Sequence, residues 1–436
     1  MVQRSNKRTM QPFYELSATE AAGLLAARQI SASSLVESCL ARIREREPVV
    51  RAWSCLDPVA ALAAARAKDA TPAQGALHGI PVGIKDVYDT CDLPTQMGSP
   101  IYSGWRPAAD ASVVALLRRA GAVIIGKTVT AEFAGMAPTD TTNPHEPAHT
   151  PGGSSSGSAA AVADRMVPIA IGTQTGGSVL RPASYCGVFG FKPTYGRVNR
   201  TGMKFAAESL DTVGWMARSL PDIALVDGVL TGGESRTLEE TRPARVGVCR
   251  THLWSTASPE TMAAVNSTAA RLAEAGVEVV NFEWPADFSR LSSARESIND
   301  YERARALAHE WAHHRNRFSS QLSAAILRGL GTSTQTHIEA LRFAERARLQ
   351  FDALMEGFDA LIAPCVQGEA PRGLAYAGDP SLQSIWTLLH IPAVGLPTHR
   401  GPRNLPVGIQ LIGSRYADVR LLQVALGVWR ILWNPQ

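Results

Sequence analysis

The stretch PGGSSSGSAAAVADRMVPIAIGTQTGGS, residues 151–178, decides the fold class. It opens in a loop rich in glycine and serine, then continues through a predicted helix start at Ala159–Val162 and an apolar strand at Val167–Ile171. It ends in a second glycine-rich turn, Gly172–Gly177, which leads to Ser178. Loops of this kind, set between apolar strands and helices, are typical of α/β proteins.

The same alternation continues toward the N-terminus. Ile80–Ile84 is a short apolar segment that predicts a buried strand, with Lys85 at its end. Val113–Ala120 predicts a helix and Ala122–Gly126 a second buried strand. These segments predict an α/β fold with a central mixed, largely parallel sheet surrounded by helices.

The two ends of the chain add helices and late strands. Ser17 and Glu20 form a capping box that predicts a helix start. Ala360–Pro364 and Val407–Ile412 predict strands, and Val419–Leu432 predicts a closing helix. With no internal repeat or long linker, we expect a single domain, 1–436, in which the more variable and largely helical region 235–355 shapes the substrate pocket.

Composition excludes several classes of function. The net charge is only +4 over 436 residues, without a basic run, so we expect no nucleic-acid partner. No apolar run has membrane-spanning length, and the polar start Met1–Pro12 lacks a signal-peptide core, which predicts a cytoplasmic protein without membrane association. The six cysteines form no C-x-x-C pair and are expected to be buried thiols.

The two glycine–serine loops fit a hydrolytic site better than the alternatives. Glycine allows backbone N–H groups to converge on a phosphate or an oxyanion. A phosphate loop would need Gly-Lys-Ser or Gly-Lys-Thr after the glycines, which neither loop has. The α/β-hydrolase pattern G-x-S-x-G is absent around Ser178, and the histidines of a Ser–His–Asp triad, His145 or His390, lack a signature context.

A second motif, His309-Glu310-Trp311-Ala312-His313, matches the zinc-protease pattern H-E-x-x-H. The pattern is short, and no third ligand is evident. We therefore expect a solvated helix face and no metal site. Trp386 and His390 are considered as pocket residues, with core packing favoured for Trp386.

The combined motifs resemble the amidase signature family, in particular its free-standing bacterial amidases. The resemblance rests on Lys85 in GIPVGIKD, on Ser154 in GGSSSGS, and on Ser178 in TGGS ahead of RPA. The two serines lie 24 residues apart (178 − 154), as in that family. Further matches occur at FGFKPT (189–194), SLDTVG (209–214) and LPVGIQ (405–410).

The resemblance implies roles for these residues. Ser178 would attack the carbonyl carbon, and Ser154, after a cis Gly153–Ser154 bond, would connect Ser178 to Lys85. The backbone N–H groups of Thr175, Gly176, Gly177 and Ser178 would form the oxyanion hole. Residues of the matching segment, with Gln174 beside the turn, would line the substrate pocket: Phe133, Gly135 and Met136. No cofactor is implied.

The proton relay makes a physical demand on Lys85. A serine hydroxyl is a weak nucleophile until a base takes its proton, and lysine is a base only when neutral. Working near pH 7 requires its pKa to fall about 3 units, which burial can supply. A neighbouring carboxylate would oppose this shift, so we expect Asp86 to point elsewhere.

Two departures from the family pattern bear on function. Gln174 replaces a common aspartate, which leaves the backbone N–H groups of the turn intact. Arg181 stands one residue later than in the Ser-Ile-Arg order typical of the catalytic chain of tRNA-dependent amidotransferases. We therefore predict a hydrolase of amide-type C–N bonds, acting on small-molecule amides, anilides (aryl acylamidase), carbamates (urethanase) or esters. A homodimer is compatible with this prediction, and a glutaminase-type amidotransferase subunit is the alternative.

Overall fold

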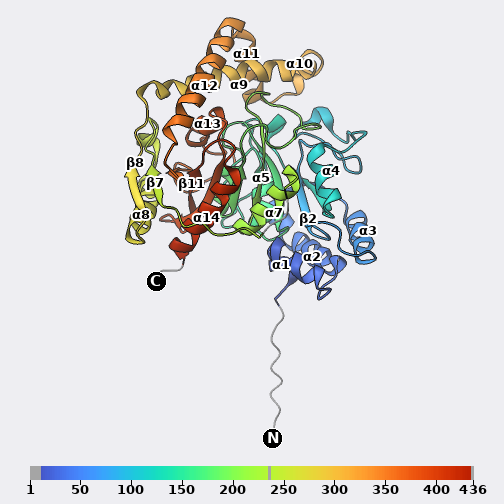
Figure 1. The fold of residues 1–436 in the computed structure, drawn as a ribbon. Coiled ribbons are helices and arrows are strands. Elements are labelled where there is room, and N and C mark those ends of the chain that lie inside the picture. The colour runs from blue at the N-terminus through green and yellow to red at the C-terminus, as the bar shows by residue number, and fades with distance from the viewer. Residues whose placement is uncertain (1–10, 234–236, 434–436) are drawn as a thin grey trace.

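One sheet of eleven strands runs through the computed structural model, which describes residues 11–233 and 237–433 (Figure 1). Its strand order is β1-β3-β2-β4-β6-β5-β10-β11-β9-β7-β8. The strands are β1 (Trp53–Leu56), β2 (Pro81–Lys85), β3 (Val123–Thr128), β4 (Ile169–Gln174), β5 (Phe189–Lys192), β6 (Thr212–Ala217), β7 (Arg245–Val248), β8 (Glu278–Asn281), β9 (Ala360–Pro364), β10 (Ala393–Arg400) and β11 (Pro406–Ile412).

Fourteen α-helices within the described residues surround this sheet, which confirms the predicted α/β class. They are α1 (Ala18–Ala26), α2 (Ala32–Val50), α3 (Pro58–Asp69), α4 (Ser112–Arg119), α5 (Ser156–Ala163), α6 (Leu180–Cys186), α7 (Leu220–Thr231), α8 (Pro259–Glu274), α9 (Leu291–Ala306), α10 (Ala308–His314), α11 (Ser320–Gly331), α12 (Thr334–Leu354), α13 (Ser381–Leu388) and α14 (Asp418–Trp433).

The sheet is mixed, but the expectation that it is largely parallel was wrong. Parallel pairing is confined to β2 with β3 and β4, and to β7 with β8 and β9. The remaining pairs, such as β10 with β11, are antiparallel. The short connection 401–405 between β10 and β11 explains one of them, because only antiparallel neighbours can be joined by a tight loop.

Local sequence accounts for the start of α1 and for the apolar strands at the centre of the sheet. Ser17 caps α1 in a complete capping box with Glu20, as predicted. Strands β2, β3 and β4 are buried along their whole length, which accounts for their nearly continuous apolar sequences. Because β2 pairs in parallel with β4, Lys85 and the turn after Gln174 lie at the same edge of the sheet.

Helices α9–α12 gather at the top of the molecule in Figure 1, opposite α1 and α2. A small apolar cluster beneath α9 and α11 is separate from the main core; it consists of Met97, Phe133, Ala304, Leu307, Leu322 and Ile326. The region 235–355, expected to be largely helical, also contains strands β7 and β8, which form one end of the sheet. The outer limits of the predicted domain, 1–436, include ends outside the described residues.

Two further expectations can be compared with the described residues. All six cysteines are free thiols, yet Cys91 is exposed and Cys55 is partly exposed, so the expectation of burial holds for the other four alone. No helix of the described residues is long and apolar enough to cross a membrane.

Candidate active site

Lys85 lies at the end of β2 and is fully buried. Its Nζ donates hydrogen bonds to Ser154 Oγ at 2.8 Å and to Thr173 Oγ1 at 2.7 Å. Burial lowers the pKa of this ammonium group to about 7, against the attraction of Asp211 and with help from the positive charges of Arg181 and Arg303. A substantial fraction of Lys85 is therefore neutral near pH 7 and able to accept a proton.

Asp86, the next residue, points away from Lys85, as expected. Its carboxylate pairs with Lys127 Nζ at 3.1 Å and accepts hydrogen bonds from Ser54 Oγ at 2.6 Å and from Gln96 N at 3.0 Å. Because a second buried lysine neutralises Asp86, the carboxylate next in sequence to Lys85 does not hold that lysine in its charged form.

Ser154 follows a cis peptide bond from Gly153, as the family resemblance implied. The Gly153 carbonyl accepts hydrogen bonds from the guanidinium of Arg181, which is fully buried and also reaches the Gly378 carbonyl. Ser155 holds the loop to β4, since Thr173 N donates to its hydroxyl at 3.3 Å. Sequence reasoning missed Thr173 and Arg181 as groups that position the lysine and the loop; the side-chain directions that reveal them come from tertiary packing.

Ser178 lies at the end of the glycine turn and is 7% exposed. Its carbonyl accepts from Ser155 N at 3.3 Å, which brings the turn against the Ser154 loop. Among the described residues no hydrogen bond reaches the Ser178 hydroxyl, so the Lys85–Ser154 contact is formed and the Ser154–Ser178 contact is not. Ser178 faces a cavity of about 330 Å³ that Thr175, Gly176 and Gly177 also line.

Side chains around the turn fix its shape. The Thr175 hydroxyl donates to the buried Asp211 carboxylate, which also accepts from two backbone N–H groups. Gln174 is fully buried and outside the cavity: its Oε1 accepts from Val179 N at 3.0 Å and Leu180 N at 3.1 Å, at the start of α6. The amide at position 174 thus organises the turn behind the cavity, rather than lining the pocket as expected.

The other expected pocket residues divide between the cavity wall and the apolar cluster behind it. Gly135 and Met136 line the cavity, whereas Phe133 is 1% exposed and packs in the cluster beneath α9 and α11. The opposite wall comes from α9 and α11, within the region that was expected to shape the pocket. Its residues are Arg295, Glu296, Asn299, Asp300, Arg303, Gln321, Leu322, Ala325 and Arg328.

The H-E-x-x-H motif lies on α10. His309 and His313 are exposed, as a solvated helix face predicts, but Glu310 is buried and pairs with Lys204 while accepting from Tyr102 Oη at 2.7 Å. Burial raises the pKa of Glu310, and the hydrogen bonds from Lys204 and Tyr102 outweigh this effect and lower it. The glutamate is an internal ion-pair partner, separate from the histidines in its environment.

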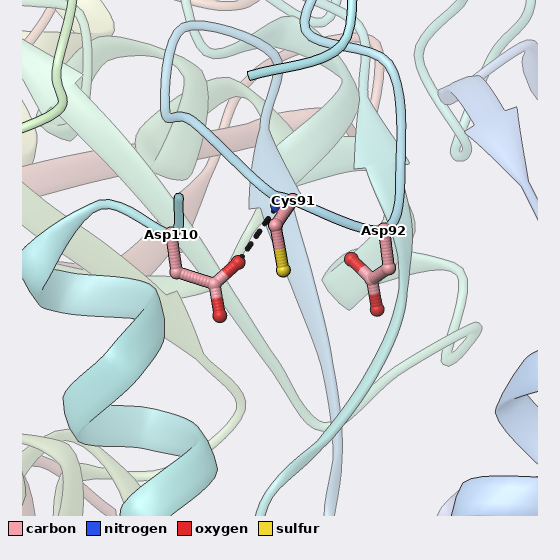
Figure 2. A group of neighbouring side chains, drawn as sticks. All are labelled: Cys91, Asp92 and Asp110. Carbon is pink, nitrogen blue, oxygen red and sulfur yellow. Dashed lines mark hydrogen bonds between the residues drawn. The ribbon is translucent and has the colours of Figure 1, made fainter. Parts of the chain in front are cut away.

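Within the described residues, a single group of three side chains has metal-ligand spacing: Cys91, Asp92 and Asp110 (Figure 2). Asp110 accepts from the Cys91 backbone N–H at 2.9 Å, and Arg118 lies 2.7 Å from Asp92 and 3.0 Å from Asp110. Burial and the neighbouring carboxylates raise the pKa of the Cys91 thiol. Since Arg118 already pairs with both carboxylates and the thiol is protonated, this surface group is a poor metal site.

The histidines considered for a catalytic triad are engaged elsewhere. His145 Nε2 is 2.9 Å from the Cys186 carbonyl, and His390 stacks on Tyr195 with its Nε2 2.7 Å from the Ser209 carbonyl. Trp386 is 1% exposed and packs against other aromatic side chains, which confirms the expected core position. Both histidines therefore contact backbone carbonyls, and the basic side chain that contacts Ser154 is Lys85.

Comparison with known proteins agrees with this arrangement. The family model described as Amidase matches residues 34–422. A Roseiflexus castenholzii protein, one of the subunits of glutamyl-tRNA(Gln) amidotransferase, is 33% identical over 98% of this chain and 98% of its own length. A Mycobacterium bovis protein named provisionally as the amidase AmiD is 34% identical over 94% of this chain and 92% of its own length.

A solved crystal structure of an amidase superposes with a TM-score of 0.87 at 29% identity, covering 95% of this chain and 99% of that one. The likeness therefore extends over the whole sheet and the helices around it, rather than over the glycine loops alone.

Proposed function

Because the chain belongs to the amidase family, whose hydrolases act on C–N bonds, we propose that it cleaves small-molecule amides through an acyl-enzyme on Ser178, with Ser154 and Lys85 as the proton relay. The observation that carries this proposal is the fully buried Lys85 Nζ, 2.8 Å from Ser154 Oγ, with a pKa lowered to about 7. A neutral amine linked to a serine hydroxyl is the base that a serine nucleophile needs.

In the acylation step, Ser178 Oγ forms a bond to the amide carbonyl carbon while its proton passes to Ser154 Oγ. The Ser154 proton passes in turn to Lys85 Nζ, which becomes an ammonium group. As the tetrahedral intermediate collapses, the C–N bond breaks, and the proton returns through Ser154 to the leaving nitrogen. The Ser154–Ser178 contact tightens when substrate is bound, as catalytic hydrogen bonds commonly do.

The oxyanion that forms in this step is stabilised by the backbone N–H groups of Thr175, Gly176, Gly177 and Ser178, which border the cavity. Gln174 and Asp211 support the turn from behind and leave those N–H groups free of side-chain competition. A water molecule then attacks the acyl-enzyme with the same relay acting as base, and the acid and free Ser178 are released.

The experiment that tests this proposal is active-site labelling with a fluorophosphonate followed by peptide mapping. We expect one adduct, on Ser178, and ammonia release from primary amides that is lost in Ser178→Ala. An intact protein that hydrolyses amides but carries its adduct on another residue, or that takes no adduct and turns over no amide, would overturn the assignment. A panel of anilides, carbamates and esters then separates aryl acylamidase from urethanase activity.

The amidotransferase relatives favour a second candidate, a glutaminase-type subunit of a complex. Both kinds of relative occur at 33–34% identity, so identity alone does not separate the two candidates. This alternative predicts co-purification with partner subunits and glutamine hydrolysis that the partners stimulate. A purified single chain that turns over other amides much faster than glutamine would exclude it.

A further inference from the structure

The helical wall of the cavity carries an excess of positive charge close to the reacting turn. Arg295 and Arg303 on α9 and Arg328 on α11 all line the cavity that Ser178 faces. Two acidic residues of α9, Glu296 and Asp300, line it as well. Whether this wall is neutral or cationic depends on which of these charges are paired with each other.

One of the three guanidinium groups is already neutralised. Arg328 Nε lies 2.7 Å from Asp300 Oδ2, and the arginine is largely exposed. Glu296 is exposed on α9 and makes no ion pair within 4.0 Å among the described residues. The buried carboxylate of Asp211 accepts hydrogen bonds from the Thr175 hydroxyl and two backbone N–H groups, and it makes no ion pair within 4.0 Å among the described residues.

The other two guanidinium groups have neutral partners in the part of the chain that the structure describes. Arg303 is 5% exposed and donates to the Phe133 carbonyl at 3.3 Å and to Asn299 Oδ1 at 3.3 Å. Arg295 makes one long hydrogen bond, 3.4 Å from Nη2 to the Thr175 carbonyl, and its buried Nε has no partner. Arg295 therefore retains unused donors beside the cavity.

Like charges surround Arg295. Burial, together with the positive charges of Arg303 and Arg181, lowers the pKa of its guanidinium to about 10, against the attraction of Asp300 and Glu296. Buried cations that lie close together without a direct ion-pair partner cost folding free energy, and a bound anion offsets that cost. Such an arrangement lowers the stability of the free protein and favours the binding of an anionic ligand.

The position of Arg295 fixes where an anion would bind. A Cβ added to Gly176 would lie 2.9 Å from Arg295 Nη2, so the guanidinium lies directly against the turn that receives the scissile carbonyl. The volume of about 330 Å³ admits a small substrate only. A group held by Arg295 is thus a few bonds from the carbon that Ser178 would attack.

We infer that Arg295, with Arg303 beside it, binds a carboxylate of the substrate, so that the preferred substrates are small amides with a carboxylate a few bonds from the scissile carbonyl. The inference rests on the proposed function of Ser178 and adds the substrate class to it. Planar guanidinium groups with free N–H donors match a carboxylate in geometry and charge.

Kinetics with a matched pair of substrates tests this inference. Succinamate carries the carboxylate, and 4-oxopentanamide replaces it by a neutral acetyl group of similar shape. We expect kcat/KM to be about 10- to 100-fold higher for succinamate, and in Arg295→Gln we expect the ratio of kcat/KM for the two amides to fall to within about 3-fold of one. Arg305→Gln, on the same helix but outside the cavity, removes an equal charge and should leave the preference in place.

A binding measurement separates failure of the inference from failure of the proposed function. In the Ser178→Ala variant, calorimetric titration with succinate should show binding that Arg295→Gln weakens at least about 10-fold and Arg305→Gln leaves unchanged. Equal kcat/KM for both amides, or a succinate affinity that Arg295→Gln leaves unchanged, would overturn the inference if Ser178 is still labelled. Loss of labelling at Ser178 would instead reject the proposed function.

Discussion

The two halves of the candidate active site differ in how they are built. On the sheet side, Lys85, Ser154 and Ser178 belong to strands and tight loops packed into the main core, and the Lys85 ammonium group has two close buried partners, Ser154 and Thr173. On the helical side, α11 and the end of α9 rest on a separate small apolar cluster, while the start of α9 packs on the main core, and Arg295 and Arg303 have long hydrogen bonds to neutral groups. Figure 1 shows these helices as a layer above the sheet.

This difference assigns bond breaking to the sheet and substrate selection to the helices. A bond-breaking step needs groups held within a fraction of an ångström, which a close-packed sheet core provides. A recognition surface on helices that cover the sheet can change without disturbing that geometry when the reacting groups lie on the strands and loops beneath them. We therefore expect changes on the sheet side to abolish turnover, and changes on the helical side to alter which substrate is preferred.

The largest effect is expected on the sheet side, from Ser178→Ala. Removal of the nucleophile should lower kcat by at least about 10⁴-fold for every amide, because no other group in the cavity can form the acyl-enzyme. The melting temperature should stay close to that of the parent chain. Steady-state kinetics checks the prediction, and retention of more than a hundredth of the activity would contradict the role of Ser178.

Lys85→Met should come next. Loss of the base is expected to reduce kcat/KM by about 10²- to 10⁴-fold. The pKa of Lys85 is lowered in the folded state, so between about pH 7 and the ordinary value of 10.5 the unfolded chain binds one more proton than the folded chain. The free energy of unfolding therefore decreases as pH falls through that window. The variant should therefore be more stable than the parent at pH 6, as thermal melts can show; a less stable variant would contradict the desolvation of Lys85.

Gly176→Ala tests the contact between the two halves. The added Cβ would meet Arg295 Nη2 at 2.9 Å and Pro380 Cβ at 3.4 Å, so the guanidinium must move away from the turn. We expect a rise in KM of about 10-fold for a carboxylate-bearing amide, since an arginine displaced by a fraction of an ångström loses its paired hydrogen bonds. In the Arg295→Gln background the same change should raise KM much less, and an equal rise would show that the turn alone is affected.

The smallest effect on turnover is expected at the H-E-x-x-H motif. Glu310→Gln breaks the buried pair with Lys204 and should lower the free energy of unfolding by about 1–3 kcal/mol above pH 5, where the glutamate is ionised. Chelators should leave kcat/KM unchanged, because Glu310 is an ion-pair partner. Denaturant melts and assays with chelator check both; inactivation by chelator would contradict this interpretation of the helix.

Sequence patterns predicted the sheet half far better than the helical half. The strand ending at Lys85 and the capping box at Ser17 follow from local apolar runs and side-chain spacing, and both are present. Thr173 and Asp211 were missed because their partners are distant in sequence. Arg295 and Arg303 resemble solvated positions on a helix, and only the packing of α9 against the turn shows that they border the cavity.

The antiparallel half of the sheet was missed for a related reason. Strand β6 is buried along its whole length, so its sequence lacks the alternation that indicates a half-buried antiparallel strand. The neutral amide at Gln174 was placed in the pocket because it departs from the family pattern, yet its role is to accept the N–H groups at the start of α6.

The pH dependence of the acylation rate shows whether Lys85 is the base. Lys192 is as buried as Lys85 and has its pKa lowered to about 7 by burial too, but it donates to backbone carbonyls away from the cavity. Lys192→Met is therefore the matched control for a buried lysine. We predict that single-turnover acylation falls about tenfold per pH unit below about pH 7, in the parent chain and in Lys192→Met alike. An acylation rate that is constant from about pH 5 to 9 would contradict Lys85 as the base. Loss of the decrease below about pH 7 in Lys192→Met would contradict it too.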